Sequence, residues 1–303
     1  LVRPPNSLKH QLLKKPVAKI KSAASTAVKE MIANGTTYYC EFSNIPKISK
    51  ELRKNSGISG KILYEPVDVM SDEAVCENIV DDNVVNKALK IGAECDGLGI
   101  SGVCEFSDKA LKKLASLSNY LALHVAEHKL SQFRSLRQTG KTEIERAIML
   151  RPKLIVHLTN PIKNDLEVLA KKKIPIVCCP RANSVLGVGV PPVKELLKRN
   201  ILVALGTDNV MFNSPDIFKE LKIVANLIGL APKETLKLTT INPAKILNLN
   251  KGVIEEGKDA DLIVLKGLEN IYNSYEVISF IVEKADKRNI WKVYCKGKEV
   301  YSR

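Results

Sequence analysis

Short apolar runs separated by amphipathic stretches extend along most of the chain. Seven runs are rich in apolar and β-branched or aromatic residues, at 36–42, 61–69, 95–103, 121–126, 154–159, 174–180 and 201–207. The stretches between them have helical periodicity, as in "SDKALKKLASLSNYL". Strands that are apolar almost throughout and alternate with helices indicate a parallel sheet covered on both faces. The sequence therefore predicts an α/β fold.

Two architectures fit this alternation. A doubly wound open sheet favours a glycine-rich phosphate loop after an early strand, and this chain has none. A closed barrel has eight strands in about 250 residues. We therefore predict a (β/α)8 TIM-type barrel over residues 1–250, of which seven strands are recognisable. Beyond it, "KGVIEEGKDADLIVL" and "NIWKVYCKGKEVY" are typical of strands with tight turns and no helix between them, so residues 251–303 predict a small β domain.

Composition excludes several classes of protein. The net charge of +14 comes from lysines spread over the whole chain, and aromatic residues make up only 5%. We interpret this charge as a solvated surface rather than a nucleic-acid site. No apolar run reaches the roughly 18 residues of a membrane span, and the start lacks the apolar segment of a secretory signal. Seven scattered cysteines favour a reducing cytoplasm, and abundant Lys and Glu favour a thermophile.

Ionisable residues lie at the ends of three apolar runs. The stretch "LALHVAEH" (121–128) holds two of the four histidines, and His157 and Asp208 end two later runs. In parallel α/β folds the active site forms where the strands end. A single histidine there is most often structural, and Asp208 alone could cap a helix. Together with His124, however, they predict a metal site, because His and Asp are ligands of zinc and iron.

Strand geometry sets a condition on the next two polar residues. Alternate residues of a strand face the same side, so Glu127 would face away from His124 if the strand continued. It can face the site only if the strand has ended. We expect His128 at the start of the following helix, on the surface or behind the ligands.

Four motifs together resemble the amidohydrolase superfamily, in particular its cytosine deaminase, chlorohydrolase and adenosylhomocysteine deaminase-like branch. They are "HVAE", "VHLTN", "CCPRANSVLGVGVPPVKELLKRNILVALGTDN" and "TTINPAKILNLNKGVIEEGKDADLIVL". The likeness runs from about residue 17 to the end and is strongest over residues 121–265. It implies a metallo-dependent hydrolase barrel followed by part of a composite β-sandwich.

The resemblance implies a role for each residue at the strand ends. His124 is a metal ligand, and Asp208 is a second ligand that also accepts a proton from the attacking water. Glu127 carries a proton to the substrate ring, and His157 orients the substrate. The implied reaction is hydrolysis of a non-peptide carbon–nitrogen bond, above all deamination of a purine- or pyrimidine-like heterocycle. One divalent metal, Zn²⁺ or Fe²⁺, would activate the water by lowering its pKa from 15.7 to about 7.

Residues after the run at 174–180 add expectations about the substrate. Arg181 stands where the family usually has a small polar residue, so it predicts recognition of an anionic group, with an exposed arginine as the alternative. Asn183 is a further predicted substrate contact. Cys178 and Cys179 are expected in the barrel wall. "CDGLGISGV" lacks the bridging lysine of binuclear members, so the resemblance implies a single metal.

The His-x-His motif of the family's first strand, which supplies two metal ligands, is absent from this chain. The remaining histidine, His10, stands alone, and residue 1 is Leu rather than Met. The resemblance therefore implies that the barrel's first strand is missing. From the family's usual layout, checked against the size of a barrel, we expect a natural protein longer by roughly 60 to 70 residues, this chain being a fragment of it or having a mis-assigned start. The alternative is a degenerate member that has lost its metal and serves as a binding or scaffold protein. The oligomeric state stays open, a homo-oligomer included.

Overall fold

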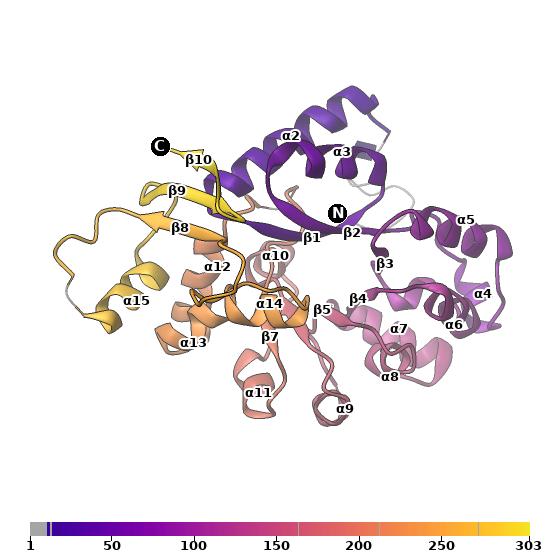
Figure 1. The fold of residues 1–303 in the computed structure, drawn as a ribbon. Helices are drawn as coiled ribbons and strands as arrows, with labels where there is room; N and C mark the ends of the chain where they lie inside the picture. The colour runs from indigo at the N-terminus through magenta and orange to yellow at the C-terminus, as the bar shows by residue number, and fades with distance from the viewer. Residues whose placement is uncertain (1–10, 13, 163, 212, 272) are drawn as a thin grey trace.

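Seven parallel strands form the main sheet of the computed structural model, which describes residues 11–303 except 13, 163, 212 and 272 (Figure 1). The strands pair in sequence order as β1 (Tyr38–Ser43), β2 (Ser59–Tyr64), β3 (Gly97–Ile100), β4 (Leu121–Val125), β5 (Leu154–His157), β6 (Ile176–Cys178) and β7 (Val203–Leu205). Each lies within one of the seven predicted runs, apart from the last residue of β1 and the first two of β2. The predicted α/β fold is therefore confirmed, as a TIM-like half-barrel of seven strands.

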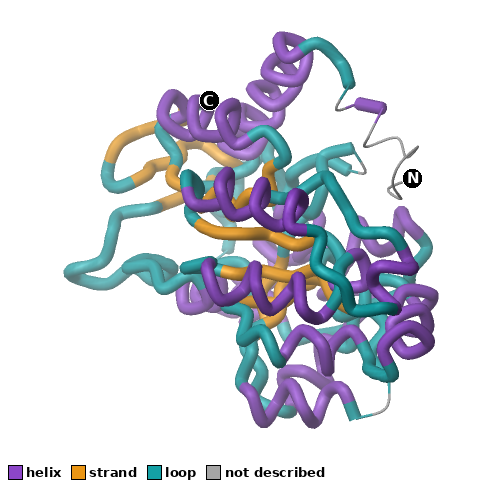
Figure 2. The backbone as a smooth tube through the Cα atoms, turned by 90° about the vertical axis from the view of Figure 1, so that its right-hand side faces the viewer, coloured by secondary structure: helices purple, strands orange, loops and turns teal. Residues whose placement is uncertain are grey.

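Helices follow the strands and flank the sheet (Figure 1, Figure 2). They are α2 (Val17–Ala33), α3 (Pro46–Ser56), α4 (Asp72–Cys76), α5 (Asp82–Ala93), α6 (Asp108–Leu117), α7 (Lys129–Thr139), α8 (Glu143–Ile148), α9 (Asp165–Lys172), α10 (Pro180–Leu186), α11 (Val193–Lys198), α12 (Ile217–Ile223), α13 (Pro232–Lys237) and α14 (Ile241–Ile246). In α6, for example, the Ser107 side chain caps the first turn, and Leu111 and Leu114 are buried. No described helix combines the length and apolarity that crossing a membrane requires.

The two faces of β4 pack into different layers. Leu121, Leu123 and Val125 belong to the large core between the sheet and its helices, and Ala122 belongs to a smaller cluster on the other face. By strand alternation, His124 shares the face of Ala122. That face therefore carries the predicted metal ligand of this strand.

A glycine on β3 makes room for an aromatic ring against His124. A Cβ atom on Gly99 would lie 2.3 Å from Cδ1 of Phe42, so only glycine lets that ring approach so closely. The ring centroids of Phe42 and His124 are in turn 4.7 Å apart. The absence of a side chain at Gly99 therefore affects the packing of a predicted site residue on the neighbouring strand β4.

The C-terminal residues form a three-stranded antiparallel sheet of β8 (Leu262–Leu265), β9 (Ile290–Cys295) and β10 (Lys298–Ser302), in the order β10-β9-β8. The prediction of no helix between these strands was wrong: α15 (Ser274–Glu283) lies between β8 and β9 and packs on α12 and α13. Its β-branched and aromatic residues are typical of a strand, and the packing of this segment on α12 and α13 favours the helix.

The small sheet also contacts the other end of the described chain. Strands β9 and β10 lie beside α2 (Figure 1), and Ile32 packs in one cluster with Ile58 and Cys295. The Cys295 thiol donates a hydrogen bond to the Thr37 carbonyl at 3.4 Å. The domain boundary at residue 250 remains a prediction.

Candidate active site at the strand ends

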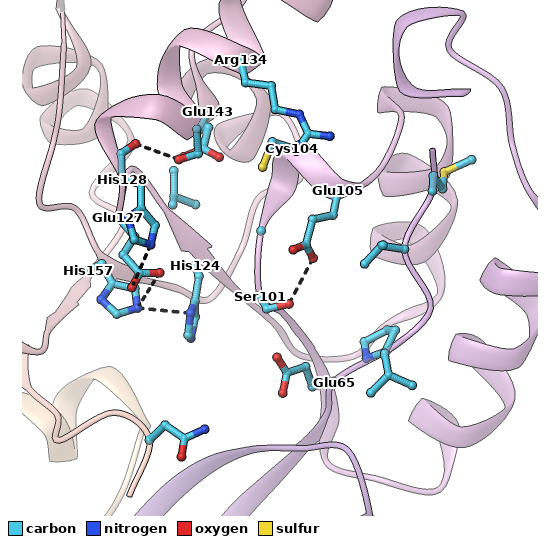
Figure 3. A pocket seen from close by; sticks show the side chains of 18 of the residues that line it. Glu65, Ser101, Cys104, Glu105, His124, Glu127, His128, Arg134, Glu143 and His157 are labelled. Carbon is cyan, nitrogen blue, oxygen red and sulfur yellow. Dashed lines mark hydrogen bonds and ion pairs between the residues drawn. The ribbon is translucent and has the colours of Figure 1, made fainter. Parts of the chain in front are cut away.

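A cavity of about 570 Å³ opens where the strands of the main sheet end (Figure 3). Polar residues that follow β1, β2, β3, β4, β5 and β7 line it, among them Asn44, Glu65, Ser101, Glu105, His124, Glu127, His128, Arg134, Glu143, His157 and Asp208. The sequence predicted a site at this edge of the sheet, and the cavity lies there.

Three side chains converge on one wall of this cavity (Figure 3). Nε2 of His157 is 3.2 Å from Nδ1 of His124 and 3.5 Å from Oε2 of Glu127. One ligand atom from each of the three residues lies within 4.8 Å of the others. Two nitrogens bound at 2.0–2.1 Å to a tetrahedral zinc lie about 3.3 Å apart. The spacing of these donors therefore suits a single metal ion.

The backbone turn after β4 is what brings Glu127 to this wall. β4 ends at Val125, and Ala126 adopts a φ of 54°, in the left-handed region that residues with a Cβ rarely occupy. The strand has therefore ended before Glu127, which is the condition that strand alternation imposed. His157 (φ 75°) and Asp208 (φ 56°) adopt the same uncommon conformation. Such backbone strain clusters at functional sites.

His157 is held from behind by two buried polar residues. Its Nδ1 lies 3.0 Å from Oδ1 of Asn183, whose Nδ2 donates to Thr159 Oγ1 at 2.8 Å. Since the Asn183 oxygen must accept, Nδ1 of His157 is the donor in this bond, and Nε2 is the nitrogen that faces His124 and Glu127. Both His157 and Asn183 are fully buried. Asn183 thus lies behind His157, and a direct substrate contact for it stays a prediction.

Two other predicted residues lie in different surroundings. Asp208 lines the cavity but is outside the group of three converging side chains. Arg181 is not among the lining residues: its guanidinium donates to the carbonyls of Ser214 (3.1 Å) and Asp216 (3.3 Å) and lies 3.5 Å from Glu220. These contacts tie α10 to the segment before α12 and to α12 itself, and substrate recognition by Arg181 remains a prediction.

His128 has a closer relation to the site than the sequence indicated. It is the N-cap residue of α7, as expected, but its Nε2 lies 3.6 Å from Oε1 of Glu127. The Glu127 carboxylate therefore lies between two imidazoles, with Oε2 near His157 and Oε1 near His128. The imidazole of His128 is 39% exposed, so solvent can reach this side of the carboxylate.

Sequence reasoning missed four carboxylates in the lining: Glu65, Asp72, Glu105 and Glu143. Glu65 directly follows β2 and accepts a hydrogen bond from Asn44 Nδ2 at 2.9 Å, and Glu105 accepts from Ser101 at 3.2 Å. Glu143 is 2% exposed, and its burial raises its pKa above the usual value. The position of Glu65 at a strand end is the one signal that could have identified it from the sequence.

Comparison with known proteins identifies the family. Residues 6–300 match the amidohydrolase family. The chain belongs to this family.

Two archaeal relatives are each 35% identical to this amidohydrolase. One is an uncharacterized protein of Methanocaldococcus jannaschii, aligned over 96% of this chain and 77% of its own length. The other, from Methanothermobacter thermautotrophicus, bears the provisional name aminohydrolase and aligns over 99% and 79%. A 5-methylthioadenosine/S-adenosylhomocysteine deaminase of Thermoanaerobacter pseudethanolicus is 27% identical over 89% of this chain and 68% of its own.

Solved structures share the fold. An adenosine deaminase from Xanthomonas campestris with bound zinc superimposes with a TM-score of 0.79 at 21% identity, over 94% of this chain and 70% of that one. An atrazine chlorohydrolase from Arthrobacter aurescens, complexed with zinc, gives 0.78 at 18% identity over 92% and 71%. At these identities the likeness shows the fold alone.

Proposed function

We propose that this amidohydrolase hydrolyses a carbon–nitrogen bond other than a peptide bond and removes an amino group from a purine- or pyrimidine-like heterocycle. The observation that carries the proposal is the convergence of His124, Glu127 and His157 within 4.8 Å on the wall of the cavity. The family membership supports hydrolysis, and the deaminase named above supports an amino group as the leaving group.

The proposed cofactor is one divalent metal, Zn²⁺ or Fe²⁺. His124 and His157 would hold it through the facing nitrogens that are 3.2 Å apart, with the carboxylate of Glu127 or of Asp208 as a further ligand. A catalytic zinc usually has three protein ligands, which this set can provide. When bound, the metal supplies a water whose pKa is lowered to about 7.

Proton transfer is the proposed task of the carboxylates. Oε1 and Oε2 of Glu127 lie next to different imidazoles, so this group can take a proton at one oxygen while the other keeps its place beside His157. Asp208, at the end of β7, would accept the proton of the attacking water. If Asp208 rather than His157 completes the metal site, as the family resemblance implies, His157, fixed by Asn183, would orient the substrate instead.

The charge of the cavity favours a neutral or cationic substrate. Among the described residues that line it, six carry carboxylates and one is an arginine: Glu65, Asp72, Glu105, Glu127, Glu143, Asp208 and Arg134. Arg134 is paired with Asp72. This acidic lining contrasts with the chain's net charge of +14, so it is a local property. Carboxylates accept hydrogen bonds from N–H and O–H groups, which amino-substituted rings and their sugars offer.

A screen for ammonia release tests the proposal. The protein, reconstituted with zinc or iron, is incubated with adenine, guanine and cytosine bases and nucleosides. We expect release from at least one of them and close to one metal per chain. No release from any substrate, or a stoichiometry well below one after reconstitution, would contradict the proposal and favour a binding protein.

Two isosteric variants then separate the roles of the carboxylates. Glu127→Gln should lower kcat by about 10² to 10⁴-fold if Glu127 transfers protons. If metal content stays near one per chain in Glu127→Gln and falls in Asp208→Asn, then Asp208 is the ligand. The reverse result makes Glu127 the ligand. Glu145→Gln, a change on α8 outside the cavity lining, serves as the control.

A further inference from the structure

A buried carboxylate that the proposed reaction does not use lies beside the turn after β4 (Figure 3). Glu143 is the first residue of α8, and its Oε2 accepts hydrogen bonds from the Ala126 amide at 2.7 Å and from Ser131 Oγ at 3.1 Å. Ala126 is the residue whose positive φ ends the strand. A carboxylate makes stronger hydrogen bonds to N–H groups than a neutral acceptor does. Glu143 therefore stabilises the turn at its strained residue.

Asn160, in the segment after β5, holds the other side of the same turn. Its backbone N–H donates to the Ala126 carbonyl at 2.8 Å, and its Nδ2 donates to the Glu127 carbonyl at 2.6 Å. The same Nδ2 donates to the Val188 carbonyl at 2.9 Å. Asn160 thus fixes the two peptide groups that flank the Cα atom of Glu127.

A fully buried glutamine joins these two residues. Oε1 of Gln132 accepts from the Glu143 backbone N–H at 2.9 Å, and its Nε2 donates to the Asn160 carbonyl at 3.1 Å. Glu143, Gln132 and Asn160 therefore form one network around the turn, which we name the Glu127 clamp.

We propose that Glu143 and Asn160 are positioning residues that hold the Glu127 carboxylate beside His157. The reason lies in strand geometry: with Ala126 in an ordinary extended conformation β4 would continue, and Glu127 would face away from His124. The clamp keeps Ala126 in the conformation that reverses this direction. What Glu127 does in the reaction rests on the proposed function, whereas the clamp is a property of the fold.

Three variants test the clamp through activity. Glu143→Ala removes the acceptor of the Ala126 amide, and we expect kcat to fall by about 10 to 100-fold, the usual loss for a residue behind an active-site group, while KM changes by less than about threefold. Glu143→Gln keeps an acceptor oxygen and should retain at least about a third of kcat. Glu145→Ala is the matched control: it removes the capping box of the same helix, in which Glu145 accepts from the Thr142 amide at 2.7 Å, without touching Ala126.

Amide hydrogen exchange at Ala126 gives a readout that does not depend on activity. We expect exchange to accelerate at least about tenfold in Glu143→Ala and to stay near wild type in Glu143→Gln and Glu145→Ala. If the wild type releases no ammonia, the proposed function fails, and exchange alone decides the clamp. The proposed role of Glu143 is overturned if amide exchange at Ala126 is unchanged in Glu143→Ala. It is also overturned if Glu143→Ala and Glu145→Ala lose kcat equally. A Glu143→Gln variant as slow as Glu143→Ala would overturn it too.

Discussion

Replacing Asn183 by alanine should uncouple His157 from its support. In the folded protein Asn183 accepts from His157 Nδ1 at 3.0 Å and donates to Thr159 Oγ1 at 2.8 Å, and all three side chains are buried. The substitution leaves two buried polar groups without their partner, each costing about 1 to 3 kcal/mol. Water entering the small void recovers part of this loss, so we expect the free energy of unfolding to fall by about 2 to 4 kcal/mol.

The same substitution should also weaken metal binding. Without Asn183, nothing fixes which nitrogen of His157 carries its proton or how its ring is oriented. Loss of such a partner typically costs 10 to 100-fold in metal affinity or activity. Zinc titration monitored by a competing chelator measures the affinity, and urea unfolding measures the stability.

Asn242→Ala is the control for Asn183→Ala. Asn242 also donates one hydrogen bond from Nδ2, to the Val203 carbonyl at 2.7 Å at the start of β7, but it does not line the cavity. We expect Asn242→Ala to lower stability by about 1 kcal/mol and to leave zinc affinity unchanged. If Asn183→Ala loses stability while its zinc affinity stays at the wild-type value, the reasoning about His157 is refuted.

Two further substitutions test the packing around the site. Arg181→Ala should lower the free energy of unfolding more at pH 8 than at pH 5.5. Burial raises the pKa of Glu220 to about 7, so stability falls as pH rises towards that value. Without the nearby arginine, the ionised carboxylate of Glu220 is costlier to bury, and this cost arises only at the higher pH. Urea unfolding at both pH values measures this, and an equal loss at both would contradict it. Gly99→Ala should displace the Phe42 ring and lower the free energy of unfolding, measured by thermal unfolding, by about 1 to 3 kcal/mol. Gly102→Ala is the control. A Cβ atom at Gly102 would meet only the flexible Glu105 side chain, at 3.3 Å, so this variant should lose less stability.

Local pattern was sufficient to predict most of the fold. The seven runs became β1 to β7 because strands buried on both faces are apolar along their whole length. The helix α15 was missed for a related reason. Its residues "SYEVISFIVE" are β-branched and aromatic, and only packing against α12 and α13 decides in favour of a helix. Intrinsic preference is a weak guide where tertiary contacts override it.

Some residues of the candidate site could likewise be predicted from the sequence, and others could not. His124 and His157 were recognisable because ionisable residues in apolar runs are costly unless they serve a purpose or find partners. The contacts of Arg181 could not be predicted, because its partners, the carbonyls of Ser214 and Asp216, lie more than 30 residues further along the chain. The role of Glu143 could not be predicted, because the sequence around the start of α8 does not indicate a hydrogen bond from the Ala126 amide to its carboxylate.

The sequence by itself determined the parallel α/β architecture, the edge of the sheet where the site lies, and the condition that Glu127 can serve it only after the strand has ended. These follow from periodicities of two and 3.6 residues, which are local. Only the tertiary structure decided that the condition is met. Ala126, with its φ of 54°, is hydrogen-bonded by Glu143 at the start of α8 and by Asn160 after β5. Hydrogen bonds between distant segments leave no periodic trace in the chain, so the direction of Glu127 had to be read from the fold.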